Sequence, residues 1–466
     1  MTARSFVLGG AVCLALSAAS LALGYEPVYD AWAWLVWGRE LAAFGLDISS
    51  GPSWKPLTVA LAVALSLAGD LAPELWLVIV RASWLFSLVL AAECAWQLAG
   101  ERAPRSARAA AAAFAAISLA LLADPVTMWA RQAAGGMSEP LLVALVLGAV
   151  RADIGGRPRL ALCLGALAAL LRPEVWPLLA IYGARRWRTD SVGRPLLVAL
   201  AVAVPVLWVA PDLLASGDAL RAAARAQRGN GGALHVLARA VALPLVAAWP
   251  LAIVALAGRD RLLLSLGAGV LAWILTVAAM AELGFAGLPR FMAPAAAVAG
   301  VLGGVGFARL LAWPSMPRAA RALALAALTL SLPGLGDRVS ELPAALRTTA
   351  RIGQSHDRLR TLADAVGRDA LLRCGRLATS DVLVRTAVAW RLEVRLSDVV
   401  SFGRPPRLSG VFLLGPQASQ SLELAIRAHG VPVATRGEWH AYSIDCPRSA
   451  GASSSASRSG VSGARR

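Results

Sequence analysis

The amino-acid sequence predicts an all-α polytopic membrane bundle followed by a small α/β domain, and three observations support this. Of the 466 residues, 58% are hydrophobic and 16% are charged, whereas a soluble protein has about 25% charged residues. Apolar segments of helical length recur as far as residue 336. Beyond residue 337, short alternating helical and strand patterns replace them.

The apolar segments give the expected membrane spans. The first, Ser5–Gly24, is interpreted as an uncleaved anchor rather than a signal peptide, because many further spans follow. The others are expected near 74–99, 107–123, 137–151, 159–171, 175–187, 195–211, 234–257, 262–282, 290–312 and 321–335. With the first anchor these segments make about eleven transmembrane helices.

The arginines predict the orientation of these spans. The chain has a formal net charge of +17, and its arginines gather in short loops such as 100–108, 185–194 and 318–321. Arginines between apolar segments are typical of cytoplasmic loops, so the charge does not indicate nucleic-acid binding. The positive-inside rule states that cytoplasmic loops carry the excess of Lys and Arg. The sequence satisfies this rule with the N-terminus inside, provided that the apolar segment 56–69 does not cross the membrane. We therefore expect a plasma or inner membrane protein with a long first outside loop, 25–73.

Three regions follow from this orientation. Residues 1–336 form the transmembrane domain, 337–447 form an extracytoplasmic α/β domain, and 448–466 form a disordered tail rich in Ser, Gly, Ala and Arg. In the α/β domain, helices are expected over 356–367 and 419–429 and strands over 376–380, 411–415, 431–434 and 439–444. Cys374 and Cys446 can form a disulfide if this domain lies outside the cytoplasm. The spacing of Cys and His predicts no metal site.

The first outside loop contains the densest pattern of polar and aromatic residues. On a helix, Asp30, Trp34, Trp37 and Leu41 share one face. One interpretation is an interfacial anchor helix that lies in the headgroup zone with its tryptophans, Trp54 among them. The other is a substrate site in which Asp30, Trp34, Trp37 and Trp54 face the ligand.

Lys55 is the only lysine of the chain and begins the short apolar segment 56–69. A cation at that depth either snorkels to the membrane edge or meets a lipid phosphate. Together with Asp30 in the same loop, it provides what glycosyl transfer from a lipid phosphate requires. A carboxylate deprotonates the acceptor hydroxyl, and a cation stabilises the departing phosphate.

Further ionisable residues fall at the outer ends of the expected spans. Glu139 and Arg290 are candidates for function, because charges near lipid are costly. Arg172 and Glu174 are interpreted as members of a salt bridge between helices or as loop charges. The basic helical face formed by Arg221, Arg225 and Arg228 is interpreted as solvated or in contact with anionic lipid.

The pattern Asp30, Arg39-Glu40-Leu41 and Lys55-Pro56-Leu57, then an apolar run to Gly69 and Arg81, resembles the GT-C membrane glycosyltransferases. It is most similar to the branch of the lipid A aminoarabinose transferases and protein O-mannosyltransferases. The resemblance covers residues 5–100 well and continues more loosely to Arg290. It implies donors in which the sugar is linked to polyprenyl phosphate, used on the outer face of the membrane, and it implies no cofactor.

The resemblance also implies roles for single residues. Asp30 matches the loop acid, and Glu139 matches a second acid on the outer side of a later span. Lys55 matches the lysine that meets the donor phosphate, and Arg290 resembles a basic residue of a late span. Ala33-Trp34 stand where relatives have Arg-Tyr, so a phosphate-binding arginine is missing there. The candidates to replace it are Arg39 and Arg81.

The sequence thus predicts an integral membrane glycosyltransferase, with membrane lipid and an extracytoplasmic glycan, lipid or protein acceptor as further partners. Asp30 and Glu139 are the candidate catalytic residues, and Lys55, Arg290, Arg39 and Arg81 are the candidates for donor-phosphate binding. Two alternatives stay open: a transporter or flippase of lipid-linked sugars, and an inactive GT-C-like scaffold of envelope assembly. No internal duplication, which is typical of transporters, is visible in the sequence.

Overall fold

The structure is a computed structural model that describes residues 3–123, 129–190, 193–227, 232–312, 318–372, 374, 377–401, 410–416 and 418–446. The chain divides into two compact units. The first consists of Met1–Asp357 and Leu383–Ser397, and the second of Arg358–Val382 and Asp398–Arg466. The predicted tail 448–466 lies outside the described residues.

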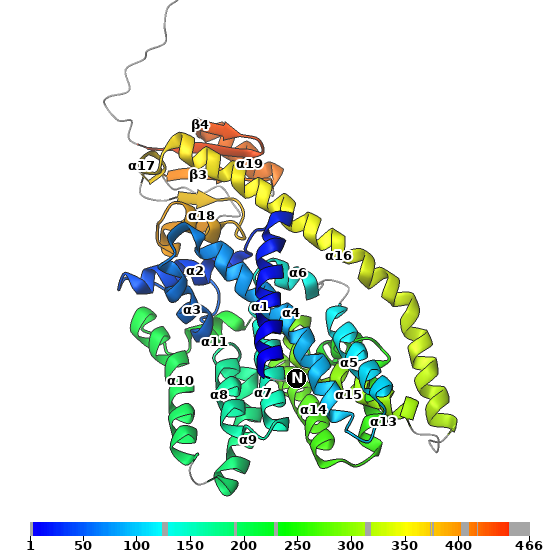
Figure 1. Cartoon of the computed structure of the whole chain (residues 1–466). Coiled ribbons are helices and arrows are strands. Elements are labelled where there is room, and N and C mark those ends of the chain that lie inside the picture. Colours follow the sequence, from blue (N-terminus) through cyan, green and yellow to red (C-terminus); the bar gives the residue numbers. More distant parts are fainter. Residues whose placement is uncertain are drawn as a thin grey trace, which may run out of the picture. The chain divides into compact units, whose positions relative to one another are not determined.

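The elements up to residue 312 are helices (Figure 1). They are α1 (Ala3–Ala19), η1 (Ser20–Leu23), α2 (Tyr29–Ala42), α3 (Pro56–Ser66), η2 (Gly69–Leu71), α4 (Ala72–Leu98), α5 (Arg105–Ala120), α6 (Trp129–Ala134), α7 (Glu139–Ile154), α8 (Pro158–Ala169), η3 (Pro173–Val175), α9 (Trp176–Thr189), α10 (Arg194–Ser216), α11 (Arg221–Ala226), α12 (Ala233–Ala242), α13 (Ala248–Ala257), α14 (Arg261–Glu282), η4 (Pro289–Met292) and α15 (Ala293–Ala312).

Five helical segments of the described residues are long and apolar enough to cross a membrane. They are Phe6–Leu23, Gly69–Leu98, Arg194–Ser216, Arg261–Glu282 and Pro289–Ala312. They identify a membrane protein, but the number of eleven spans and the orientation stay predictions. Helix α3 has 11 residues and rises about 17 Å, which is too short for a bilayer core of about 30 Å.

Two predicted boundaries were wrong. The segment 234–257 forms two helices, α12 and α13, with Pro244 between them; proline has no N–H to continue a helix. The expected span 321–335 and the expected helix 356–367 belong to one helix, α16 (Arg318–Val366). Arg338 in its middle donates to the carbonyl oxygens of Leu121 and Leu243 at 2.7 and 2.9 Å, and these bonds hold α16 where the sequence suggested a boundary.

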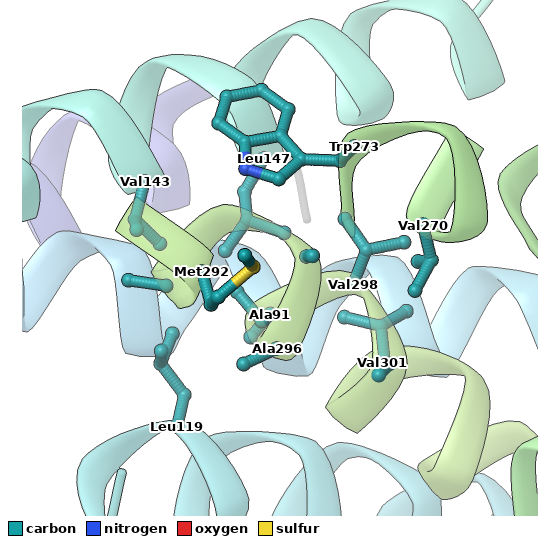
Figure 2. Close-up of a cluster of buried hydrophobic side chains, with 14 of the residues drawn as sticks. Ala91, Leu119, Val143, Leu147, Val270, Trp273, Met292, Ala296, Val298 and Val301 are labelled. Atoms are coloured by element: carbon teal, nitrogen blue, oxygen red, sulfur yellow. The ribbon is translucent and has the colours of Figure 1, made fainter. Parts of the chain in front are cut away.

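The core of the first unit surrounds α15, which packs against α4, α5, α13 and α14. Figure 2 shows part of this core, where Val143, Leu147, Trp273 and Met292 meet. Glycines on α15 permit a close helix approach. A Cβ at Gly304 would lie 2.4 Å from the carbonyl oxygen of Ala111 in α5. Small residues at helix contacts are typical of membrane bundles, because they let two backbones approach closely.

The second unit contains the sheet expected near the C-terminus. Its elements are α17 (Arg368–Leu372), β1 (Leu377–Thr379), β2 (Val399–Ser401), β3 (Gly410–Leu414), α19 (Gln420–His429), β4 (Val431–Arg436) and β5 (Trp439–Ile444). The strand order is β2-β1-β3-β5-β4, with β1 parallel to β2 and β3, and β5 antiparallel to β3 and β4. Cys374 and Cys446 form a disulfide with their Cα atoms 5.5 Å apart.

Three elements were not expected: β2, α17 and helix α18 (Arg385–Arg391). Helix α18 belongs to the first unit, where it contacts α2, although its sequence neighbours form the sheet. A short helix between two strands has too few residues to show an amphipathic period. Residues 383–397 therefore belong to the helical first unit, although the local sequence does not indicate this.

Candidate active site

Helix α2 positions the first acid and an aromatic platform. The preceding Val28 is extended, and Asp30 lies in the first turn of the helix, where the helix dipole favours a negative charge. Trp34 follows one turn later and is fully buried. Gly38 lets α3 approach, because a Cβ there would lie 2.5 Å from Ala62. This close contact between α2 and α3 brings Lys55, which precedes α3, over the Trp34 ring at 4.9 Å.

Lys55 is the central cation of the site. Its Nζ donates to Ser138 Oγ at 2.7 Å and lies 3.9 Å from Glu139 Oε1. The residue is 7% exposed, and burial lowers the pKa of the ammonium to about 8. The charged form is held by the neighbouring carboxylate and hydroxyl, so a buried lysine stays cationic here near neutral pH.

Glu139 and Arg290 complete the cluster. Glu139 is fully buried at the start of α7, and its Oε1 lies 3.5 Å from Arg290 Nε. Arg290 Nη2 lies 3.9 Å from Asp30 Oδ2, so this arginine bridges both acids. Within the described residues, neither oxygen of Glu139 accepts a hydrogen bond. The structure thus brings together Asp30, Lys55, Glu139 and Arg290, which are distant in the sequence.

Arg172 is a further cation of the site, to which the sequence analysis gave a structural role and not a functional one. It is 8% exposed, and its guanidinium carbon lies 3.4 Å from the centre of the Phe291 ring. Its Nε lies 3.7 Å from Glu174 Oε1, but this ion pair is local to η3 and does not join two helices as the interhelical interpretation expected. However, its Nε and Nη2 make no hydrogen bond with the described residues. A buried guanidinium with unused donors is suited to hold an anion.

Phe291 holds the two arginines in place. Its ring contacts Arg172 and also lies 5.7 Å from Arg290. Its carbonyl oxygen accepts a hydrogen bond of 2.8 Å from Trp273 Nε1 of α14. Phe291 follows Arg290 directly in the sequence, whereas its contact with Arg172 depends on the packing of distant helices.

The other two candidate phosphate-binding arginines have different partners. Arg39 donates to the carbonyl oxygens of Trp390 and Val394 at 3.1 and 2.8 Å, so it fastens the segment that contains α18. Arg81 donates to Ser20 Oγ at 2.8 Å and to the carbonyl oxygen of Ala134 at 3.0 Å. Neither is among the ion-pair partners of the cluster within the described part of the chain.

The tryptophans of α2 are packed inside the protein. Trp32, Trp34 and Trp37 are at most 2% exposed, so this face does not lie among lipid headgroups, and the interfacial anchor interpretation was wrong. Trp37 contacts Trp54 with their ring centres 6.0 Å apart. Of the aromatic candidates, Trp34 is the one with a cation-π contact to the cluster within the described part of the chain, through Lys55.

The basic face near residue 221 has a structural role. Arg221 and Arg225 donate to the carbonyl oxygens of Ser50 and Ser49 at 3.1 and 2.9 Å. They therefore fasten the loop that precedes Lys55. Arg228 lies outside the described residues.

The site can bind an anion and move a proton. Three cations, Lys55, Arg172 and Arg290, stand with the carboxylates Asp30, Glu139 and Glu174. Among the described residues, no group of three or more His, Cys, Asp or Glu is placed to hold a metal ion. A phosphate would be bound here by side-chain cations, as charge-assisted hydrogen bonds permit.

The fold is similar to that of a solved membrane protein. The crystal structure of ArnT from Cupriavidus metallidurans bound to undecaprenyl phosphate superposes with a TM-score of 0.56. The match covers 95% of this chain and 98% of that chain at 15% sequence identity. No protein-family model and no curated protein matches the sequence. The likeness shows that this chain shares the fold of that protein. Membership of the GT-C glycosyltransferases, and the branch within them, stay predictions.

Proposed function

We propose that this chain is an integral membrane glycosyltransferase that takes a sugar from polyprenyl phosphate and attaches it to an extracytoplasmic glycan, lipid or protein. The observation that carries the proposal is the cluster of Lys55, Arg172 and Arg290 beside the carboxylates Asp30 and Glu139. The similarity of the fold to ArnT, whose structure contains undecaprenyl phosphate, supports the same choice of lipid.

The cations would stabilise the phosphate as it leaves. Lys55 Nζ makes one hydrogen bond within the described chain, to Ser138, and keeps further N–H groups for phosphate oxygens. Arg172 Nε and Nη2 are likewise without hydrogen bonds to the described residues. When the bond between the anomeric carbon and the phosphate oxygen breaks, both electrons stay on that oxygen. Cations at that oxygen lower the barrier most where water is excluded.

Asp30 is the better candidate for the general base. Its side chain is 22% exposed, whereas that of Glu139 is fully buried. An acceptor hydroxyl can reach Asp30, which takes its proton as the acceptor oxygen bonds to the anomeric carbon. Glu139 then acts as a positioning residue that holds Lys55 and Arg290. This assigns different roles to the two acids.

The location of the site is proposed on the outer side of the membrane. The distribution of arginines favours this side for the first loop. The disulfide between Cys374 and Cys446 also fits an oxidising compartment. Membrane lipid would surround the helices, and the donor lipid would reach the site from the bilayer.

Sugar transfer in membranes tests the proposal. Vesicles with the wild type, Asp30→Asn or the exposed control Asp70→Asn receive radiolabelled mannose, glucose, galactose or arabinose on polyprenyl phosphate. We expect one donor to label a new product with the wild type and the control. Loss of the base lowers the rate about 10²- to 10⁴-fold in Asp30→Asn.

Three other outcomes would contradict the proposal. Equal transfer by Asp30→Asn and the wild type would remove Asp30 from the chemistry. If no donor is consumed but a lipid-linked sugar crosses the bilayer, the chain is a transporter or flippase. If neither happens, the scaffold interpretation is favoured.

A further inference from the structure

A small recess adjoins Arg290 on the side of α6. It is lined by Trp129, Gln132, Leu243, Pro289, Arg290 and Ala293. Its space is about that of one water molecule. Because Arg290 also contacts Asp30 and Glu139, a group in the recess lies beside the proposed reaction centre.

Three buried polar atoms of the recess residues are unsatisfied. Trp129 Nε1, Gln132 Oε1 and Arg290 Nε have no hydrogen-bond partner among the described residues, and Trp129 and Gln132 are 3% and 7% exposed. Trp129 and Gln132 are three positions apart on α6 and so share one face. Leaving one buried donor and one buried acceptor unpaired is costly, so such a pair indicates an absent partner.

A hydroxyl group is both an acceptor and a donor, so its chemistry suits an unpaired indole N–H together with an unpaired amide oxygen. A carboxylate cannot donate to Gln132, and an ammonium cannot accept from Trp129 and would be repelled by Arg290. The chemistry of the recess therefore matches a neutral hydroxyl-bearing group.

We infer that the recess binds one hydroxyl or hydroxymethyl group of a sugar in the reaction and so determines which sugar is used. The inference rests on the proposed function, which places a sugar beside Arg290. The hydroxyl belongs either to the sugar on the donor lipid or to the acceptor. A site built to pair a hydroxyl discriminates strongly against a substrate without it.

Binding to the purified full-length chain in detergent tests the donor. The Kd is measured for undecaprenyl phosphate alone and for undecaprenyl phosphate carrying mannose, glucose, galactose or arabinose. The variants are Gln132→Leu and Trp129→Phe. The matched control is Trp84→Phe, because Trp84 Nε1 is also unpaired among the described residues but is not a lining residue.

We expect at least one sugar to tighten binding by the wild type about tenfold over undecaprenyl phosphate alone. Each recess variant reduces this gain about three- to tenfold, as expected for one lost hydrogen bond. The Kd for undecaprenyl phosphate alone and the behaviour of Trp84→Phe stay unchanged. This result assigns the hydroxyl to the donor.

Transfer in membranes with saturating donor tests the acceptor. A slower transfer in both recess variants with unchanged donor binding assigns the hydroxyl to the acceptor. If neither binding nor transfer changes in either variant, the inference is wrong and the recess holds only water. If undecaprenyl phosphate does not bind to the wild type at all, the proposed function itself fails.

Discussion

The charge of Lys55 offers the sharpest test of the donor site. Lys55→Met removes the ammonium and keeps an unbranched apolar stem. A hydrogen bond from a charged donor contributes about 1.5–3 kcal/mol, and 1.4 kcal/mol corresponds to a tenfold change in affinity. Since Lys55 Nζ makes one hydrogen bond within the described chain, a phosphate gains at least one from it. We expect the Kd for undecaprenyl phosphate to rise about 10- to 150-fold.

The pH dependence follows from the same residue. Burial lowers the pKa of Lys55 to about 8 from its ordinary value of 10.5. A bound phosphate favours the charged ammonium and therefore raises this pKa in the complex. Affinity is then constant below pH 8 and falls by up to tenfold per pH unit above it, until the pKa of the complex is reached. The phosphate monoester has its second pKa near 6 and does not titrate in this range.

The assay is a titration of the detergent-purified chain with undecaprenyl phosphate between pH 7 and 10. Lys55→Arg flattens the profile, because a guanidinium stays charged throughout. The control is Arg131→Met, which removes an exposed positive charge that is not part of the cluster. Unchanged affinity in Lys55→Met, or a flat profile for the wild type, would refute the assignment of Lys55 to the phosphate.

Two further predictions concern packing and charge. In Gly306→Ala the new Cβ would lie 1.8 Å from a carbonyl oxygen of α13, so we expect a loss of about 1–3 kcal/mol in thermal unfolding; Gly269→Ala, with open space around it, is the control and should change little. Glu139→Gln removes the buried negative charge that balances the positive charges of Lys55 and Arg290. We expect the free energy of unfolding to fall by about 3–5 kcal/mol. Undecaprenyl phosphate should then raise the Tm of Glu139→Gln more than that of the wild type, and an equal or smaller rise would contradict the view that Glu139 balances these cations.

Much of the secondary structure was predictable from the sequence. The helix over the first loop, the shortness of the segment after Lys55 and most of the C-terminal strands agree with α2, α3, β1, β3, β4 and β5. The helices and strands follow from local periodicity, and the shortness of α3 follows from comparing its length with the thickness of a bilayer. Both periodicity and segment length can be seen in the sequence. The error at 234–257 arose because Pro244 was given too little weight. The error in α16 arose because the change of composition near residue 337 was interpreted as a boundary, whereas Arg338 anchors a continuous helix there.

The composition of the site was partly predictable. Asp30, Lys55, Glu139 and Arg290 were named from their residue types at the ends of apolar segments, and the structure brings them within ion-pair distances. Arg172 was interpreted only as a member of an interhelical salt bridge or as a loop charge. Its unused donors become visible only when Phe291 is seen against its guanidinium.

The sequence by itself determined that the chain is a helical membrane protein with a C-terminal sheet, and it determined which charges stand at the ends of apolar helices. Those features follow from hydrophobicity and length, which act along the chain. The tertiary structure decided which arginines lie in the cluster with Lys55. It also decided that Arg39 donates its hydrogen bonds to carbonyl oxygens of the segment 383–397. A charge acquires its partner through the packing of distant helices, such as the close contact of α2 and α3 at Gly38, and no local pattern of residues encodes that distance.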